Sequence, residues 1–251
     1  DFGSTQLSSS NVVELADGFK LITVNGQFSG QQFTLIKGKD QVIPMDFDAT
    51  YSLQHNLATT NTQIDKLSFT SRQKAKPLLD LSISQPITIS PAGDVSGNSS
   101  LSLKLSQLNL ADWKPVVGEF ASAGLVDATM DVSFENGGKD IQTTYQTTVT
   151  KLTLVSGTNA PSPIDTAVKG KLAVKNFQSV KGDAVLNVSG KFADIQLNNL
   201  QVAADLSVNV STQQVVTPNL TASIQHAGKP AGSFDFSGTY TPTNATGKFD
   251  F

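Results

Sequence analysis

Alternation of apolar and polar residues with a period of two recurs along most of this 251-residue chain. In residues 126–134 (VDATMDVSF) every second residue is apolar, and a similar run at 141–149 follows the turn 136–138 (NGG). Strand side chains point to opposite faces with period two, and a glycine-containing loop supplies the positive φ of a tight reversal. The pattern predicts a β-hairpin, and its repetition predicts a large antiparallel β protein with one apolar face.

Strand candidates cover the whole chain and are separated by turns rich in Gly, Asn and Asp. They are residues 19–24, 33–37, 45–53, 64–70, 78–84, 101–105, 125–135, 141–154, 168–174, 183–188, 195–200, 202–210, 220–225, 233–240 and 247–251. Strands joined by short loops pair antiparallel, so we expect an all-β, up-and-down meander. We expect one elongated domain over residues 1–251, with the proline-containing loop 158–163 as the candidate internal division.

One segment departs from this period. Residues 112–121 (DWKPVVGEFA) place apolar side chains at i, i+3, i+4, i+7 and i+8, which is one face of a helix. Asp112 can cap its free amides. We expect one short amphipathic helix near 112–123 that acts as a lid over one end of the β structure, with the only tryptophan as its anchor. The expected lid residues are Trp113, Val116, Val117 and Phe120.

The composition excludes several classes of function. A formal net charge of −3 and a single arginine argue against a nucleic-acid partner, because such proteins concentrate Lys and Arg on one face. The absence of cysteine excludes disulfides and thiolate metal sites. The sequence has no apolar run near the length of about 18 residues that spans a bilayer, and it begins with Asp1. We interpret the chain as a mature form or as a piece of a longer protein.

The sequence contains no recognisable catalytic or metal-binding motif. His55 and His226 lie far apart, and neither has a second ligand at the usual spacing. The pairs Asp46 with Asp48, and Asp127 with Asp131, each share a strand face, which permits a calcium site or an acid–base pair but is more typical of a solvated polar face. We therefore expect no enzyme activity and no cofactor.

The alternation also predicts which residues line the apolar interior. Those residues are Val126, Met130, Val132, Phe134, Leu152, Leu154, Leu206, Val208 and Val210. The same pattern fits a closed β-sandwich with a dry core and an open groove, so periodicity alone leaves both possible.

Residues 101–157 resemble a segment of the AsmA-like family of bacterial envelope proteins, the group of AsmA and TamB. The shared order of parts is an alternating strand at 101–105, the stretch 108–113 (LNLADW), a short helix, a strand that opens at 123–128 (AGLVDA), the turn 136–138 and a closing strand at 150–154. The family is similar to the repeating β-groove lipid-transfer proteins of eukaryotes.

The resemblance implies a long antiparallel sheet bent into a β-taco-like groove with an apolar lining. It implies a non-enzymatic segment of a periplasm-spanning conduit that transports phospholipid between the inner and outer membranes. The implied partners are phospholipid acyl chains, together with membrane or envelope proteins that contact other parts of a parent chain anchored to the inner membrane. The alternative is a structural or adhesive β module of the cell envelope with a closed core.

Overall fold

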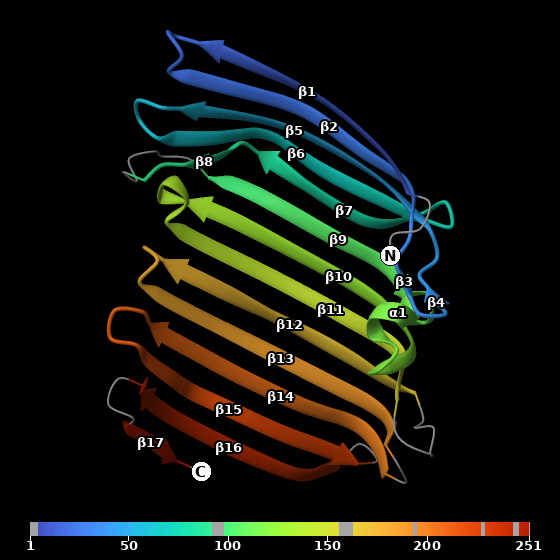
Figure 1. Ribbon diagram of the computed structural model, residues 1–251. Coiled ribbons are helices and arrows are strands. Elements are labelled where there is room, and N and C mark those ends of the chain that lie inside the picture. Colours follow the sequence, from blue (N-terminus) through green and yellow to red (C-terminus); the bar gives the residue numbers. More distant parts are fainter. Residues whose placement is uncertain are drawn as a thin grey trace.

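The computed structural model describes residues 5–91, 98–155, 163–192, 195–226, 229–242 and 246–250. Strands make up 79% of the structure, and nearly all of them join one curved sheet (Figure 1). The strands are β1 (Gln6–Ala16), β2 (Leu21–Phe33), β3 (Ile36–Lys37), β4 (Asp40–Gln41), β5 (Met45–Asn56), β6 (Asn61–Gln73), β7 (Lys76–Gln85), β8 (Ile87–Ile89), β9 (Ser99–Asn109), β10 (Ala121–Glu135), β11 (Asp140–Leu154), β12 (Ile164–Lys175), β13 (Ser179–Phe192), β14 (Ile195–Asn209), β15 (Gln214–His226), β16 (Lys229–Thr241) and β17 (Thr246–Asp250). The helical segments are η1 (Leu110–Trp113), α1 (Lys114–Val117) and η2 (Asn136–Gly138).

The sheet is an antiparallel meander that does not close on itself. Its order is β1-β2-β5-β6-β7-β9-β10-β11-β12-β13-β14-β15-β16-β17, while β8 pairs with β6, and β3 and β4 form a separate hairpin. With neighbouring strands about 4.8 Å apart, this path is about 60 Å long. The expected all-β meander curled into a groove is confirmed, and the closed sandwich is wrong, because the sheet is not closed and the second sheet among the described residues is only the two-stranded hairpin β3–β4.

The accessible surface shows how open this arrangement is. The chain exposes 15377 Å², whereas a compact protein of 26.5 kDa exposes about 10,700 Å². Only a few apolar side chains of the described residues are buried, and they are scattered along the sheet. Backbone hydrogen bonding between long strands, rather than a central apolar core, is therefore the main organising feature of the fold.

Three bulges of the same design bend the sheet at the strand ends near α1. Gln32, Gln107 and Lys151 each have a φ between 50° and 54° and interrupt the register of β2, β9 and β11. Each backbone N–H donates to an aspartate of the following strand in the sheet. The three distances are 2.9 Å from Gln32 to Asp46, 2.9 Å from Gln107 to Asp127 and 2.8 Å from Lys151 to Asp165. Bulges increase local twist, so they favour a curled sheet.

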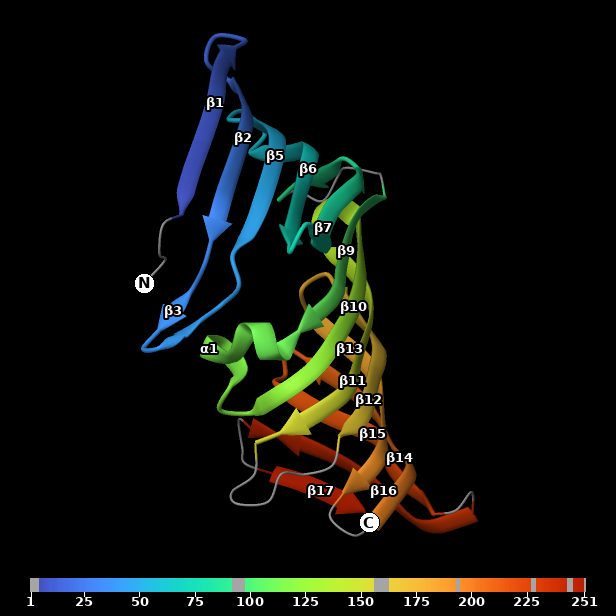
Figure 2. The same cartoon turned by 90° about the vertical axis from the view of Figure 1, so that its right-hand side faces the viewer.

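The expected short helix is confirmed, and it packs beside the hairpin β3–β4 at one end of the strands (Figure 2). Its first turn is a 3₁₀ turn, with the Asn109 side chain accepting from Ala111 N at 3.1 Å. The helical residues end at Val117, and β10 begins at Ala121, which pairs with Leu154. Residues 121–123, which helical periodicity assigned to the helix, therefore belong to β10 because they pair with β11.

Other differences from the sequence prediction concern strand extent. β1 was not predicted, and the two candidates at 195–200 and 202–210 form the single strand β14. The loop 158–163 lies, except for its last residue, outside the described residues. β11 and β12, the strands on its two sides, pair with each other in the same sheet.

Candidate functional site: a continuous apolar face

The register aligns one residue from each strand of the main path, from β1 to β16, into a line that runs across the sheet. We call this line the inner row. Its members, each directly opposite the next, are Ser9, Phe28, Ala49, Phe69, Leu81, Leu103, Met130, Tyr145, Gly170, Ala184, Ala204, Leu220 and Phe236. Directly opposed residues point to the same face of a sheet. Apart from Ser9 at the β1 edge and Gly170, which has no side chain, the inner row therefore forms a band of apolar and aromatic side chains across almost the whole sheet.

The adjacent line of residues points to the opposite face and has the opposite character. We call it the outer row, and it consists of Ser10, Gln27, Thr50, Ser68, Ser82, Ser102, Asp131, Thr144, Lys171, Asp183, Asp205 and Asn219. Every member is polar or charged. A slip of one residue in any strand would move its apolar set to the outer face. The amphipathic pattern thus specifies the register of each strand.

The inner row is uncovered. None of its side chains is buried, and Phe28 is 36% exposed. Other apolar residues of the same face are more exposed still, among them Val13 at 61%, Leu172 at 40% and Phe234 at 48%. Soluble monomers rarely expose apolar patches larger than a few hundred Å² unless the patch binds something. The face that carries the inner row, the inner face, is therefore the candidate functional site.

Most of the residues predicted to line an apolar interior share this face. Val126, Met130, Val132 and Phe134 alternate along β10, with Val132 only 8% exposed. In β14, Leu206 lies opposite Gly182, Val208 lies opposite Val180, and Leu206 is 43% exposed.

The other predicted lining residues lie near strand ends. Leu152 pairs with the buried Ile164, and Leu154 pairs with Ala121. Val210 follows the end of β14 and is 51% exposed, because the chain turns there toward β15.

An aromatic cluster in the N-terminal half of the inner face was not among the predicted lining residues. Phe47 lies 5.4 Å from Phe28, 5.9 Å from Phe33 and 5.7 Å from Phe69, measured between ring centroids. Its ring also lies over Gly30 of the neighbouring strand, where a Cβ would overlap it. Alternation in 45–53 (MDFDATYSL) was the available signal, because it puts Met, Phe, Ala, Tyr and Leu on one face.

The helix and the hairpin β3–β4 together cover one margin of the inner face, and we call this unit the clasp. Leu110 contacts the inner face there, since a Cβ on Gly124 would lie 3.0 Å from its Cδ1 and 3.2 Å from Val149 Cγ1. A hydrogen bond joins the two parts of the clasp, because Ile43 N, just after the hairpin, donates to Asp112 O at 3.4 Å. A second bond ties the clasp to the main sheet: Gln73 Nε2 of β6 donates to Ile43 O at 2.7 Å.

Charged side chains add to the clasp. The ion pairs are Lys37 with Glu119 at 3.0 Å, Lys74 with Asp112 at 2.8 Å and Lys114 with Asp40 at 3.1 Å. Most of these groups are exposed, and exposed pairs contribute about 0–1 kcal/mol each. Burial of Val42, which is 2% exposed, contributes to the stability of the clasp as well.

The four expected lid residues differ in burial. Trp113 and Val117 are half-buried, and Trp113 Nε1 is buried with no acceptor among the described atoms. Val116 is 52% exposed and Phe120 is 73% exposed, because the helix ends before its second apolar turn. The buried contacts come instead from Leu110 and Pro115.

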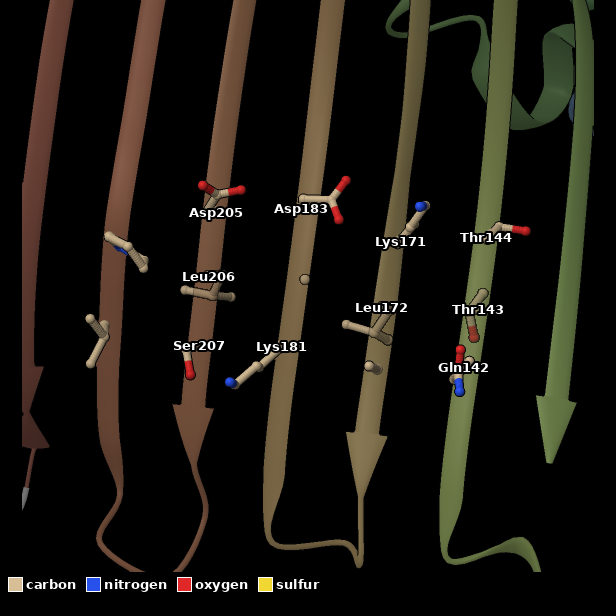
Figure 3. A pocket seen from close by; sticks show the side chains of 14 residues that line it. Gln142, Thr143, Thr144, Lys171, Leu172, Lys181, Asp183, Asp205, Leu206 and Ser207 are labelled. Atoms are coloured by element: carbon tan, nitrogen blue, oxygen red, sulfur yellow. The ribbon is translucent and has the colours of Figure 1, made fainter. Parts of the chain in front are cut away.

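A hollow in the C-terminal half of the sheet is lined by residues of both faces (Figure 3). It has a volume of about 620 Å³ and spans β11 to β15. Lys171, Asp183 and Asp205 of the outer row line it, together with Lys181 and Ser207. Leu172 and Leu206, which belong to the inner face, line it as well.

Groups suited to catalysis or metal binding do not gather in the part of the chain that the structure describes. His55 Nδ1 lies 2.9 Å from Thr62 Oγ1 on the neighbouring strand. The carboxylates of Asp46 and Asp127 accept the bulge amides, and Asp131 accepts from Ser102 Oγ at 2.6 Å. No cluster of three or more metal-ligating side chains occurs among the described residues. Within the same residues, no helix combines the length and the hydrophobicity needed to cross a membrane.

No family model matches the chain, and neither a curated protein nor a solved structure is significantly similar to it.

Proposed function

We propose that the chain is a non-enzymatic lipid-binding groove that holds phospholipid acyl chains along its inner face. The observation that carries this proposal is the inner row, which from Phe28 in β2 to Phe236 in β16 contains no polar or charged side-chain group other than the Tyr145 hydroxyl and has none of its side chains buried. An acyl chain lying on it would lose water on one side while the backbone of the sheet stays fully paired. Burial contributes about 0.8 kcal/mol per methylene, so about eight buried methylenes contribute about 6 kcal/mol.

The dimensions of the groove suit a conduit better than a single closed pocket. The sheet path of about 60 Å is longer than one acyl chain, and no described segment crosses the inner face to interrupt it. We therefore propose that lipids move along the inner row from strand to strand. Together with the resemblance to AsmA-like proteins, this supports a role as a segment of a periplasm-spanning path for phospholipid between the two membranes, within a parent protein anchored to the inner membrane.

Mass spectrometry of organic extracts tests the proposal. The protein is purified without detergent, extracted with chloroform and methanol, and compared with an equal amount of a closed β-sandwich protein prepared in parallel. We expect phospholipids or fatty acids at a stoichiometry near one or more per chain. The double variant Leu103→Asp with Met130→Asp should carry several-fold less. Extracts with no lipid above the sandwich control would contradict the proposal and favour a structural or adhesive role.

A further inference from the structure

The strand β1 forms one edge of the sheet, and its outward side is open (Figure 1). All eleven residues of β1 are exposed, and they pair with β2 without a bulge. The strand contains no proline and no lysine, and Glu14 is its only charged residue. Natural sheets normally protect such edges with short strands, lysines, prolines or bulges. Among the described residues β1 pairs with β2 alone, so its outward backbone groups are available to a further strand.

The sequence of β1 is complementary to itself in the antiparallel direction. A two-fold axis that passes beside its midpoint, Asn11, and between the two strands brings all eleven residues into register with a second copy. This register places Leu7 opposite Leu15 and Ser9 opposite Val13, all on the inner face. On the outer face it places Ser8 opposite Glu14, so that no like charges meet. Leu7 and Leu15, which are 61% and 55% exposed, would cover each other.

We propose that β1 is a dimerisation edge and that it pairs with β1 of a second copy of this chain, centred on Asn11. A two-fold axis perpendicular to the sheet keeps both inner faces on the same side, because opposed residues share a face. The two inner rows then join into one apolar path of twice the length. The pairing itself depends only on the edge and its register, so it holds or fails independently of lipid binding.

Cysteine crosslinking tests the register, because the chain contains no other cysteine. In Asn11→Cys the two thiols of a dimer face each other directly, and mild oxidation should link most of the chains into a disulfide-bonded dimer. In Ser9→Cys each thiol faces Val13 of the other copy, and at least ten-fold less dimer should form. Equal crosslinking of both variants would overturn the proposed register.

Light scattering after size-exclusion chromatography tests the dimer directly. The unmodified protein should have twice the 26.5 kDa mass of one chain. Asn11→Lys places two ammonium groups opposite each other and should give monomers. Because Tyr51 donates a hydrogen bond to Asn11, Tyr51→Phe serves as the matched control and should remain dimeric. A monomer at all concentrations, or growth into larger head-to-tail assemblies, would overturn the proposal.

Discussion

Replacing Met130 by aspartate puts a charge in the middle of the inner row without disturbing the backbone of the sheet. Met130 lies between Leu103 and Tyr145 on the neighbouring strands, and its side chain is half-buried. In an open groove the carboxylate reaches water, so we expect the free energy of unfolding to fall by about 1 kcal/mol. In a dry core the same change would cost several kcal/mol.

The expected effect on lipid binding follows from the contact that is lost. In the variant, about two methylenes of an acyl chain that crosses this position would no longer be buried against the side chain. The loss in binding free energy is about 1.6 kcal/mol, which corresponds to roughly a 15-fold rise in Kd. The matched control is Gln146→Asp, which adds the same charge on the exposed outer face of the adjacent strand, opposite Thr129 and Lys169. Its Kd should stay within about two-fold of the unmodified protein.

Titration with a fluorescent fatty acid measures both Kd values, and urea unfolding measures both stabilities. The reasoning is refuted if Met130→Asp and Gln146→Asp bind the fatty acid equally well. It is also refuted if Met130→Asp unfolds the protein, because that would show a closed core around this position.

Three further substitutions test the parts that shape the groove. Trp113→Ala should lower the stability of the clasp by about 2 kcal/mol, seen as faster proteolysis there, while the far-UV circular dichroism of the sheet stays unchanged. Asp127→Ala removes the acceptor of the Gln107 amide and should cost about 1 kcal/mol in urea unfolding, whereas Asp127→Asn, which keeps an acceptor oxygen, should cost less. Gly30→Ala would push a Cβ into an aromatic ring of β5 and should destabilise the protein by about 1–3 kcal/mol. Gly232→Ala, where the nearest atom lies 3.8 Å from the added Cβ, should have little effect. Equal midpoints of urea unfolding for the two variants would show that the ring is not held against the sheet.

Alternation predicted the strands and their faces well where it was strong. In residues 126–134 of β10 the period of two runs without a break, and the register places the apolar residues of this stretch on one face with their neighbours in β9 and β11. In β1 the run of Ser8, Ser9 and Ser10 hid the alternation of Leu7 and Val13. An exposed edge strand needs few apolar residues, so its signal is weak.

Three other features depended on contacts that a local pattern does not contain. A groove and a sandwich differ in whether a second large sheet covers the apolar face of the first. The strands of both show the same apolar–polar alternation, so the sequence pattern does not distinguish them. The extent of the helix depended on the pairing of Ala121 with Leu154, which competes with helical periodicity. Val42 is almost fully buried because the hairpin packs on the helix, a contact between segments far apart in the sequence.

Photocrosslinking tests most directly the claim that lipid lies along the inner face. A fatty acid with a diazirine on its chain is bound to the protein and irradiated, and the labelled residues are identified by peptide mass spectrometry. The account predicts labels on inner-row residues such as Leu81, Leu103 and Leu220, spread over many strands. Labels confined to the outer row, or equal on both faces, would contradict it.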